Sequence, residues 1–362
     1  MLKPSYQLPD PTLFDGCETI GILKALASAN RSLAELKGRA AAIPNQGILI
    51  DTLALQEAKA SSEIENIVTT QDELFQADLF PEGLESPAAK EVALYRDALK
   101  FGFDKLQQTG GLITNSTMIG MFQLLKQRTD GFRQTPGTAL KNERSGAIVY
   151  VPPQEQQEIY AAMDRLERFI NDDQFSPLDP LIKMALIHHQ FESIHPFPDG
   201  NGRIGRIINV LYLTRVDLLE IPILYLSRAI NNSKSEYYRL LQHVRETGDW
   251  EDWLIYMLKA VDETARTTLD LVENIRDQMA STKKRLREHL PKIYSQDLLN
   301  NLFRHPYTRI DYVQNELGIT RQTAAKYLDM LAEHGFLTKH QSGRSNYYIN
   351  EPLVALFLKV SG

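Results

Sequence analysis

The sequence has few of the features that mark secreted, membrane or nucleic-acid-binding proteins. Its 362 residues include a single cysteine, Cys17, which excludes an internal disulfide and suits a reducing cytoplasm. The N-terminus lacks the continuous apolar segment of a signal peptide, and no run approaches the roughly 18 apolar residues of a membrane span. The formal net charge of −6 argues against a general nucleic-acid binder. We therefore expect a cytoplasmic protein with no membrane partner.

The composition that remains is that of a globular protein with two or three domains. Hydrophobic residues make up 43% of the chain and charged residues 24%, so the chain can bury a substantial core. Alternation at 147–151 before a Pro-Pro stop predicts a β-hairpin within residues 135–153. Apolar residues at helical spacing predict helices at about 19–40, 51–66, 114–128, 154–171 and 178–193, with more downstream. Residues 72–108 read as a further helical region with a polar, Pro-containing interruption. The capping residues we expect are Asp51 or Thr52, Asn115 or Ser116, and Ser233 or Ser235.

The most informative stretch, residues 195–206, reads HPFPDGNGRIGR and lies between two helical segments. Gly200 and Gly202 permit backbone angles that let successive N–H groups point into one concavity. The loop opens a helix whose N-terminal N–H groups and dipole favour an anion. Arg203 and Arg206 lie on the same side of the first turn and add forked donors suited to phosphate oxygens. The stretch therefore predicts a phosphate-binding loop.

Two titratable residues of this stretch add chemistry to the loop. Asp199 would repel phosphate directly, so its carboxylate makes sense as a ligand of a Mg²⁺ that bridges phosphates. His195, whose ordinary pKa lies near neutrality, is suited to taking a proton from an incoming hydroxyl. A short turn, an arginine pair or a histidine after a helix is by itself usually structural. Together these residues favour a nucleotide-phosphate site with a general base beside it.

Residues 195–206 match the pattern H-x-F-x-D-G-N-G-R-x-x-R and so resemble the core motif of the Fic family (filamentation induced by cAMP), without a departure. The resemblance implies transfer of AMP from ATP to a Ser, Thr or Tyr hydroxyl of a protein, with Mg²⁺ as cofactor. It implies that His195 is the base and Asp199 the metal ligand. Arg203 would hold the phosphates and Arg206 the γ-phosphate.

The resemblance also assigns the other residues of the site. Phe197 would be the buried anchor of the loop rather than a chemical participant. Fic relatives place a tyrosine near position 237 against the nucleotide base, which implies Tyr237 here. His188 and His189 could suggest a metal site with the base, but histidines on a helix face usually pack, and the base of the family is a single histidine. The remaining implied nucleotide-binding residues are Gly200, Asn201 and Gly202, which form the anion hole, with Ile204 and Gly205.

A second motif lies upstream of the loop. Residues 61–66 read SSEIEN, which by itself is an ordinary helix end with Asn66 as a C-cap. It resembles the S-x-x-x-E-N inhibitory motif that some Fic proteins carry upstream of the core, with Ser61, Glu65 and Asn66 as its regulatory residues. The resemblance implies that Glu65 pairs with Arg206 in the place of the γ-phosphate. ATP would then bind with its α-phosphate misaligned for in-line attack.

The predicted hairpin has two interpretations. By itself it is a hairpin that covers the core. In Fic proteins a hairpin flap at this position borders the active site and is thought to align the target by strand addition, for which an exposed edge is suited. The resemblance therefore implies that a protein target lies along residues 138–153.

The C-terminal part has a different pattern. Residues 262–292 read as one long polar helix that ends in a basic run at 283–287, a connector that could also lie along a partner subunit in a homodimer. From residue 293, three short helices and an alternating segment around a Gly turn resemble a winged helix-turn-helix. From residue 296 to the end there are seven Lys/Arg and six Asp/Glu, so partner recognition or dimerisation is at least as well supported as DNA binding. Residues that could contact DNA are Arg321, Gln322, Lys326 and Arg344.

We therefore expect a mostly α fold: a Fic-type helical core with a small β-hairpin flap, and a C-terminal winged helix-turn-helix. The expected parts are an N-terminal helical region at 1–100 with the inhibitory helix, a Fic core at 101–275, a basic helical linker at 276–292 and the winged helix at 293–362. Alternatives remain open: a nucleotide-sensing DNA-binding regulator, a Fic enzyme with another donor such as UTP or CDP-choline, or one that removes AMP, with Glu65 aligning a hydrolytic water.

Overall fold

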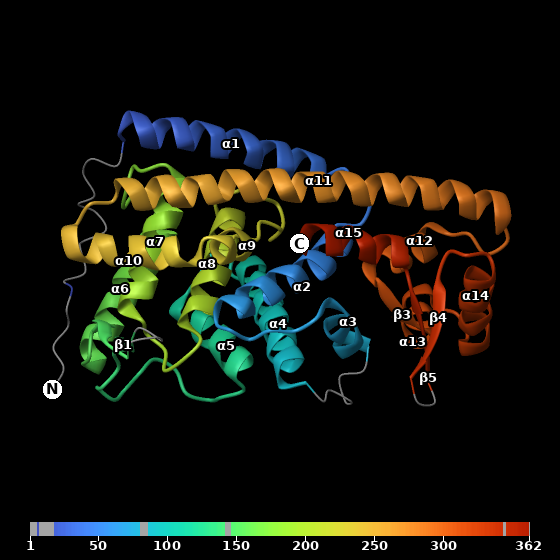
Figure 1. Cartoon of the computed structure of the whole chain (residues 1–362), viewed down its shortest axis with the longest axis horizontal. Helices are drawn as coiled ribbons and strands as arrows, with labels where there is room; N and C mark the ends of the chain where they lie inside the picture. Colours follow the sequence, from blue (N-terminus) through green and yellow to red (C-terminus); the bar gives the residue numbers. More distant parts are fainter. Residues whose placement is uncertain (1–5, 7–17, 80–85, 142–145, 343–344, 362) are drawn as a thin grey trace.

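The computed structural model describes residues 6, 18–79, 86–141, 146–342 and 345–361 (Figure 1). These residues form a mostly helical protein with two small antiparallel sheets, as the sequence predicts. Residues 142–145 of the predicted hairpin, and Arg344 in the predicted wing, lie outside the described residues. None of the described helices is both long and apolar enough to cross a membrane.

Two helices run side by side along one side of the molecule: α1 (Ile20–Ala40) and the 39-residue α11 (Glu251–His289) (Figure 1). The side chain of Thr19 caps α1 by accepting a hydrogen bond from the backbone N–H of Ile22. The helix predicted from residue 262 begins at Glu251 instead, because its apolar face continues through Trp253 and Leu254, which are fully buried. It packs against α1 within the same chain.

Four helices follow α1: α2 (Gly47–Ile64), α3 (Gln71–Leu79), α4 (Pro87–Gln108) and α5 (Asn115–Lys126). The prediction that α2 begins at Asp51 or Thr52 is wrong, since the hydroxyl of Thr52 donates within the helix to Ile48 O. The caps predicted for α5 are also wrong. Thr114 caps that helix by accepting from the N–H of Thr117.

Helices α7 (Pro180–Ile194) and α8 (Asn201–Arg215) pack against each other and are joined by the motif loop. Every residue of α7 from Leu181 to Ile194 is buried. Around this pair lie the hairpin β1 (Leu140–Lys141) and β2 (Ile148–Tyr150), α6 (Gln156–Asn171), α9 (Ser227–Asn232) and α10 (Lys234–Thr247). Ser233 is the residue before α10, but its hydroxyl donates to Ala229 O and does not cap the helix.

The C-terminal unit contains the three predicted helices and the predicted hairpin, together with a strand and a helix that we did not predict. The three strands pair antiparallel in the order β3-β5-β4. The unit contacts α2 and α3: Arg304 forms an ion pair with Asp51, and the hydroxyl of Tyr307 donates to Asp72 at 2.6 Å. Its elements are α12 (Gln296–Arg304), β3 (Tyr307–Arg309), α13 (Ile310–Leu317), α14 (Arg321–Glu333), β4 (Thr338–Ser342), β5 (Ser345–Ile349) and α15 (Glu351–Ser361).

Candidate active site

Two residues in left-handed backbone conformations mark the ends of the motif loop. His195 has φ 49° directly after α7, and Gly200 has φ 78° directly before α8. The side-chain amide of Asn201 holds the loop closed: its oxygen accepts from Phe197 N and its nitrogen donates to Phe197 O, both at 2.8 Å. The Asn201 side chain is therefore used to shape the loop, while the N-terminus of α8 points into it.

Aromatic packing of Phe197 and hydrogen bonds from Arg133 hold the motif loop in place. Phe197 is fully buried and stacks on Phe122 with ring centroids 4.4 Å apart, in keeping with its expected place as an anchor. Arg133 donates to His195 O at 2.7 Å and to Pro153 O at 2.8 Å. It thereby joins the loop to the end of the hairpin segment. Sequence reasoning missed Arg133, because no local pattern marks a side chain that binds backbone carbonyls about 60 residues away.

The imidazole of His195 is neutral in this setting. Burial lowers the pKa of His195 to about 3, with a further contribution from the positive charges of Arg133 and Arg245. This differs from the near-neutral pKa expected from the sequence, because the pattern alone does not show the burial or the two cations. Its Nδ1 makes no hydrogen bond with any described residue. A neutral imidazole has a lone pair with which it can accept a proton.

Four charged side chains form a continuous network beside the loop. Asp199 accepts from Lys126 Nζ at 2.6 Å, Lys126 also contacts Glu91 at 3.1 Å, and Glu91 pairs with Arg203 at 2.5 Å. Burial alone would raise the pKa of Asp199, but the hydrogen bond and charge of Lys126 hold that pKa below its usual value. Glu91 comes from α4 and Lys126 from α5, so the sequence motif gives no sign of either.

The residues at the loop fit a Mg²⁺ that is bound together with a nucleotide. The carboxylate of Asp199 is 63% exposed, and Mg²⁺ in proteins commonly binds one or two carboxylates plus substrate phosphates. Among the described residues, no group of three or more His, Cys, Asp or Glu could hold a metal by itself. Lys126 already occupies one oxygen of Asp199 and would have to share the carboxylate with the metal.

Arg206 lies at the centre of a buried network with α2. Its side chain is 1% exposed, Nε donates to Ser61 Oγ at 2.8 Å, and one terminal nitrogen donates to Glu65 Oε1 at 3.0 Å. The expected pairing of Glu65 with Arg206 is therefore present. Asn66 has φ 61°, as expected of a residue that ends a helix, and its side chain accepts from Lys234 at 3.1 Å.

A deeper carboxylate extends this network along the same face of α2. Glu57, Ser61 and Glu65 are four residues apart, which places them on one side of the helix. Glu57 is 1% exposed and accepts from the hydroxyls of Tyr95 and Ser227. Burial raises the pKa of Glu57 to about 7. The motif match did not include Glu57, although its four-residue spacing from Ser61, which continues the spacing from Ser61 to Glu65, was a signal that could have found it.

Tyr237 lies in the core in this structure. It is 1% exposed, and its hydroxyl is 2.8 Å from Nε2 of His188, whose Nδ1 is 3.0 Å from the amide of Asn209. His189 is fully buried as well, with Nε2 3.2 Å from Leu241 O. Both histidines are therefore packing residues here. The expected contact of Tyr237 with a nucleotide base stays a prediction.

The described part of the hairpin presents apolar side chains to solvent. Ile148 is 50% exposed and Val149 is 42% exposed, whereas Tyr150 is buried. The hydroxyl of Tyr150 donates to Ser193 O at 2.6 Å, two residues before His195. The exposed strand is therefore tied directly to the end of the helix that leads into the loop.

The C-terminal residues considered for DNA contact do not form a group of free cations. Arg321 pairs with Asp311 at 2.5 Å, and the nearby Lys339 pairs with Asp329 at 2.7 Å. Gln322 and Lys326 are exposed on α14. The paired carboxylates reduce the positive potential that phosphate binding needs.

Comparison with known proteins identifies three matching regions in order along the chain. The profile of the Fic/DOC family N-terminal region matches residues 23–104, and that of the Fic/DOC family matches residues 113–213. The profile of the protein adenylyltransferase SoFic-like C-terminal domain matches residues 278–353.

Curated relatives are similar over part of the chain. Protein adenylyltransferase Fic of Drosophila erecta is 28% identical over 150 residues, which is 40% of this chain and 28% of that protein. The protein of the same name in Drosophila grimshawi is 30% identical over 115 residues, or 32% of this chain and 22% of that protein. The chain thus spans less than a third of the length of these relatives.

Solved structures show the same fold at low identity. A Fic family protein from Desulfovibrio desulfuricans has a TM-score of 0.56 and 19% identity, over 96% of this chain and 98% of that one. Fic-1 of C. elegans has a TM-score of 0.54 and 19% identity, over 70% of this chain and 74% of that one.

Proposed function

Because the chain belongs to the Fic/DOC family, we propose that it is a protein adenylyltransferase that transfers AMP from ATP to a Ser, Thr or Tyr hydroxyl of a protein. The observation that carries the proposal is the loop geometry. A neutral His195 lies at one end of a loop whose other end is the N-terminus of α8, with Arg203 and Arg206 fixed on that helix by carboxylate partners. Proton acceptance and anion binding are therefore available within one loop.

In the proposed reaction, His195 takes the proton of the target hydroxyl as that oxygen attacks the α-phosphorus of ATP. The bond from the α-phosphorus to the bridging oxygen breaks, and pyrophosphate leaves. The backbone N–H groups at the start of α8 and the guanidinium of Arg203 hold the phosphates and stabilise the developing charge. Mg²⁺, held by Asp199 together with the phosphates, would neutralise phosphate charge when it is bound. The target would lie along the exposed strand at 148–150.

We further propose that the protein is autoinhibited by Glu65. The carboxylate takes up the guanidinium of Arg206 that would otherwise bind the γ-phosphate, so ATP can bind only with its α-phosphate out of line. The position of Glu65 supports this proposal. Its carboxylate pairs with Arg206 and lies directly beside the backbone of Gly202.

The experiment that tests both proposals incubates wild type, Glu65→Gly and His195→Ala with labelled ATP and Mg²⁺, followed by mass spectrometry of the product. We expect self-labelling to rise at least tenfold in Glu65→Gly and to be lost in His195→Ala. Parallel reactions with UTP and CDP-choline identify the donor. Release of AMP from a labelled protein by the wild type but not by Glu65→Gly would favour the reverse reaction. Equal labelling in all three proteins would refute the proposed function.

A further inference from the structure

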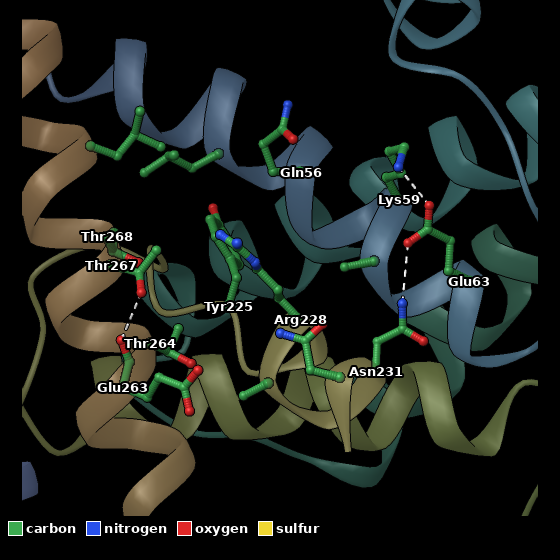
Figure 2. Close-up of a pocket in the computed structure, with 15 residues that line it drawn as sticks. Gln56, Lys59, Glu63, Tyr225, Arg228, Asn231, Glu263, Thr264, Thr267 and Thr268 are labelled. Carbon is green, nitrogen blue, oxygen red and sulfur yellow. Dashed lines mark hydrogen bonds and ion pairs between the residues drawn. The ribbon is translucent and has the colours of Figure 1, made fainter. Parts of the chain in front are cut away.

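A cavity of about 150 Å³ lies between α2, α9 and α11 (Figure 2). None of the residues proposed above for catalysis, nucleotide binding or inhibition lines it. The cavity lies on a different side of α2 from Arg206. Ser61 and Glu65 face Arg206, whereas Leu53 and Ala60 line the cavity. A cavity of this size holds a molecule of about six non-hydrogen atoms.

One cation in this cavity lacks a partner. The side chain of Arg228 extends from α9 into the space between α2 and α11 (Figure 2). Its Nη1 atom is buried and makes no hydrogen bond, and no described residue forms an ion pair with its guanidinium. Arg203 and Arg206, whose side chains are buried, each have a carboxylate partner in the structure. A buried donor without a partner is uncommon, and a guanidinium is shaped to bind an oxyanion.

The remaining walls of the cavity contribute two threonine hydroxyls. Its two carboxylates are paired or exposed, so they would repel a bound anion only weakly. Thr264 and Thr268 of α11 are 8% and 6% exposed, and neither hydroxyl bonds to a described residue. Two carboxylates also line the cavity. Glu63 is already paired with Lys59 at 2.5 Å, and Glu263 is on the exposed side of α11.

We propose that this cavity binds a small oxyanion, a carboxylate or a phosphate, through the guanidinium of Arg228 and the hydroxyls of Thr264 and Thr268. The ligand would also lie near Lys59 on α2, so it would connect the inhibitory helix to α9 and α11. A bound ligand stabilises the arrangement that forms its site. A bound oxyanion would therefore stabilise the position of α2 from a side of the helix other than the one that carries Glu65.

Calorimetric titration of the full chain with orthophosphate and with malonate, at matched ionic strength in chloride, tests the proposal. We expect saturable binding of one of the two probes, which identifies the class of oxyanion. Arg228→Gln should weaken this binding at least tenfold, because charge-assisted hydrogen bonds are lost. Arg276→Gln, which removes a partly exposed arginine elsewhere on α11, should leave it unchanged.

A substitution at Arg206, on α8, distinguishes binding in this cavity from binding at the proposed nucleotide site. Arg206→Gln should retain the binding that Arg228→Gln loses, whatever the outcome of the ATP-labelling experiment. Thr268→Val gives a second test with little change in shape and should weaken binding severalfold. Hydrogen exchange of the α2 amides should slow on saturation in the wild type but not in Arg228→Gln. Equal affinity in wild type and Arg228→Gln, or no saturable binding of either probe, would overturn the proposal.

Discussion

Glu65 and Gly202 approach each other so closely that a β-carbon added to the glycine would lie 2.6 Å from Glu65 Oε1. The same added carbon would lie 3.0 Å from Arg206 Nη1. Glycine at position 202 therefore leaves room for the pair of Glu65 and Arg206, whereas its backbone angles do not require glycine. The contact also places the Glu65 carboxylate directly beside the first turn of α8, in the space where we propose that a phosphate of ATP binds.

This contact makes Gly202→Ala a direct probe of the Glu65 position. In the wild type the added methyl group must displace Glu65 from Arg206, and overpacking of this kind costs about 1–3 kcal/mol. In a Glu65→Gly background the first clash is absent, and alanine is favoured over glycine in a helix by about 1 kcal/mol. We expect Gly202→Ala to destabilise the wild type and to be neutral or stabilising in Glu65→Gly, measured by urea unfolding without nucleotide. Additive effects of the two substitutions would contradict this position of Glu65.

Two neighbouring serines of α2 allow the contribution of the hydrogen bond between Arg206 and Ser61 to stability to be measured. Ser61 and Ser62 are both fully buried, but only the hydroxyl of Ser61 accepts from Arg206, while that of Ser62 has no partner among the described residues. Ser61→Ala leaves a buried charged donor unsatisfied, which costs about 1–3 kcal/mol. Ser62→Ala removes no hydrogen bond and takes away a buried hydroxyl without a partner, so it should not destabilise the protein. Thermal unfolding of the two variants provides the comparison, and similar effects would show that Ser61 does not hold Arg206.

Glu57 should make stability depend on pH near neutrality. Burial raises the pKa of Glu57 from 4.5 to about 7, so the folded state binds its proton more tightly than the unfolded state. The resulting stabilisation is complete below pH 4.5 and is lost as the pH rises towards 7, a change of at most about 3 kcal/mol. Glu192, with a pKa raised to about 7 by burial, adds a contribution of the same sign.

Glu57→Gln removes one of these two carboxyl titrations, so the change in unfolding free energy from pH 5 to pH 8 should be less negative than in the wild type. The slope is the measurement, because the amide also changes the hydrogen bonds with Tyr95 and Ser227 at every pH. The exposed Glu155→Gln is the control and should keep the wild-type slope. A Glu57→Gln profile parallel to that of the wild type would show that Glu57 keeps the same charge at pH 5 and pH 8.

The motif residues could be predicted because each motif is continuous in sequence. Residues 195–206 contain the loop, the proposed base and both arginines, and residues 61–66 contain the partner of Arg206. The charge network around the loop could not be predicted in this way. Glu91 is 112 residues from Arg203, and only the packing of α4 against α8 brings the two together.

Helix ends were predicted less well than helices, for local reasons. No side chain caps α2 at Gln46 or α11 at Trp250, so neither start has the polar signal that we sought. At α5 three polar residues in a row could each have served as the cap, and Thr114 does. Strand β3 has three residues, which is too short for alternation to be recognised.

The last prediction concerns the attachment of the C-terminal unit to α2. Burial opposes ionisation of Asp51, but the nearby cations Lys100 and Arg304 hold the pKa of Asp51 below its usual value. Asp51→Asn removes the charge that both cations share and should lower stability by about 2 kcal/mol. Hydrogen exchange should speed up at α12 and in the first half of α2. Because Asp51 and Arg304 act as one pair, Asp51→Asn combined with Arg304→Gln should cost less than the sum of the two. Asp97→Asn, at an exposed aspartate of α4, serves as the control and should leave exchange at α12 unchanged. Full additivity, or unchanged exchange at α12 in Asp51→Asn, would mean that the C-terminal unit is held by its other contacts, such as that of Tyr307 with Asp72.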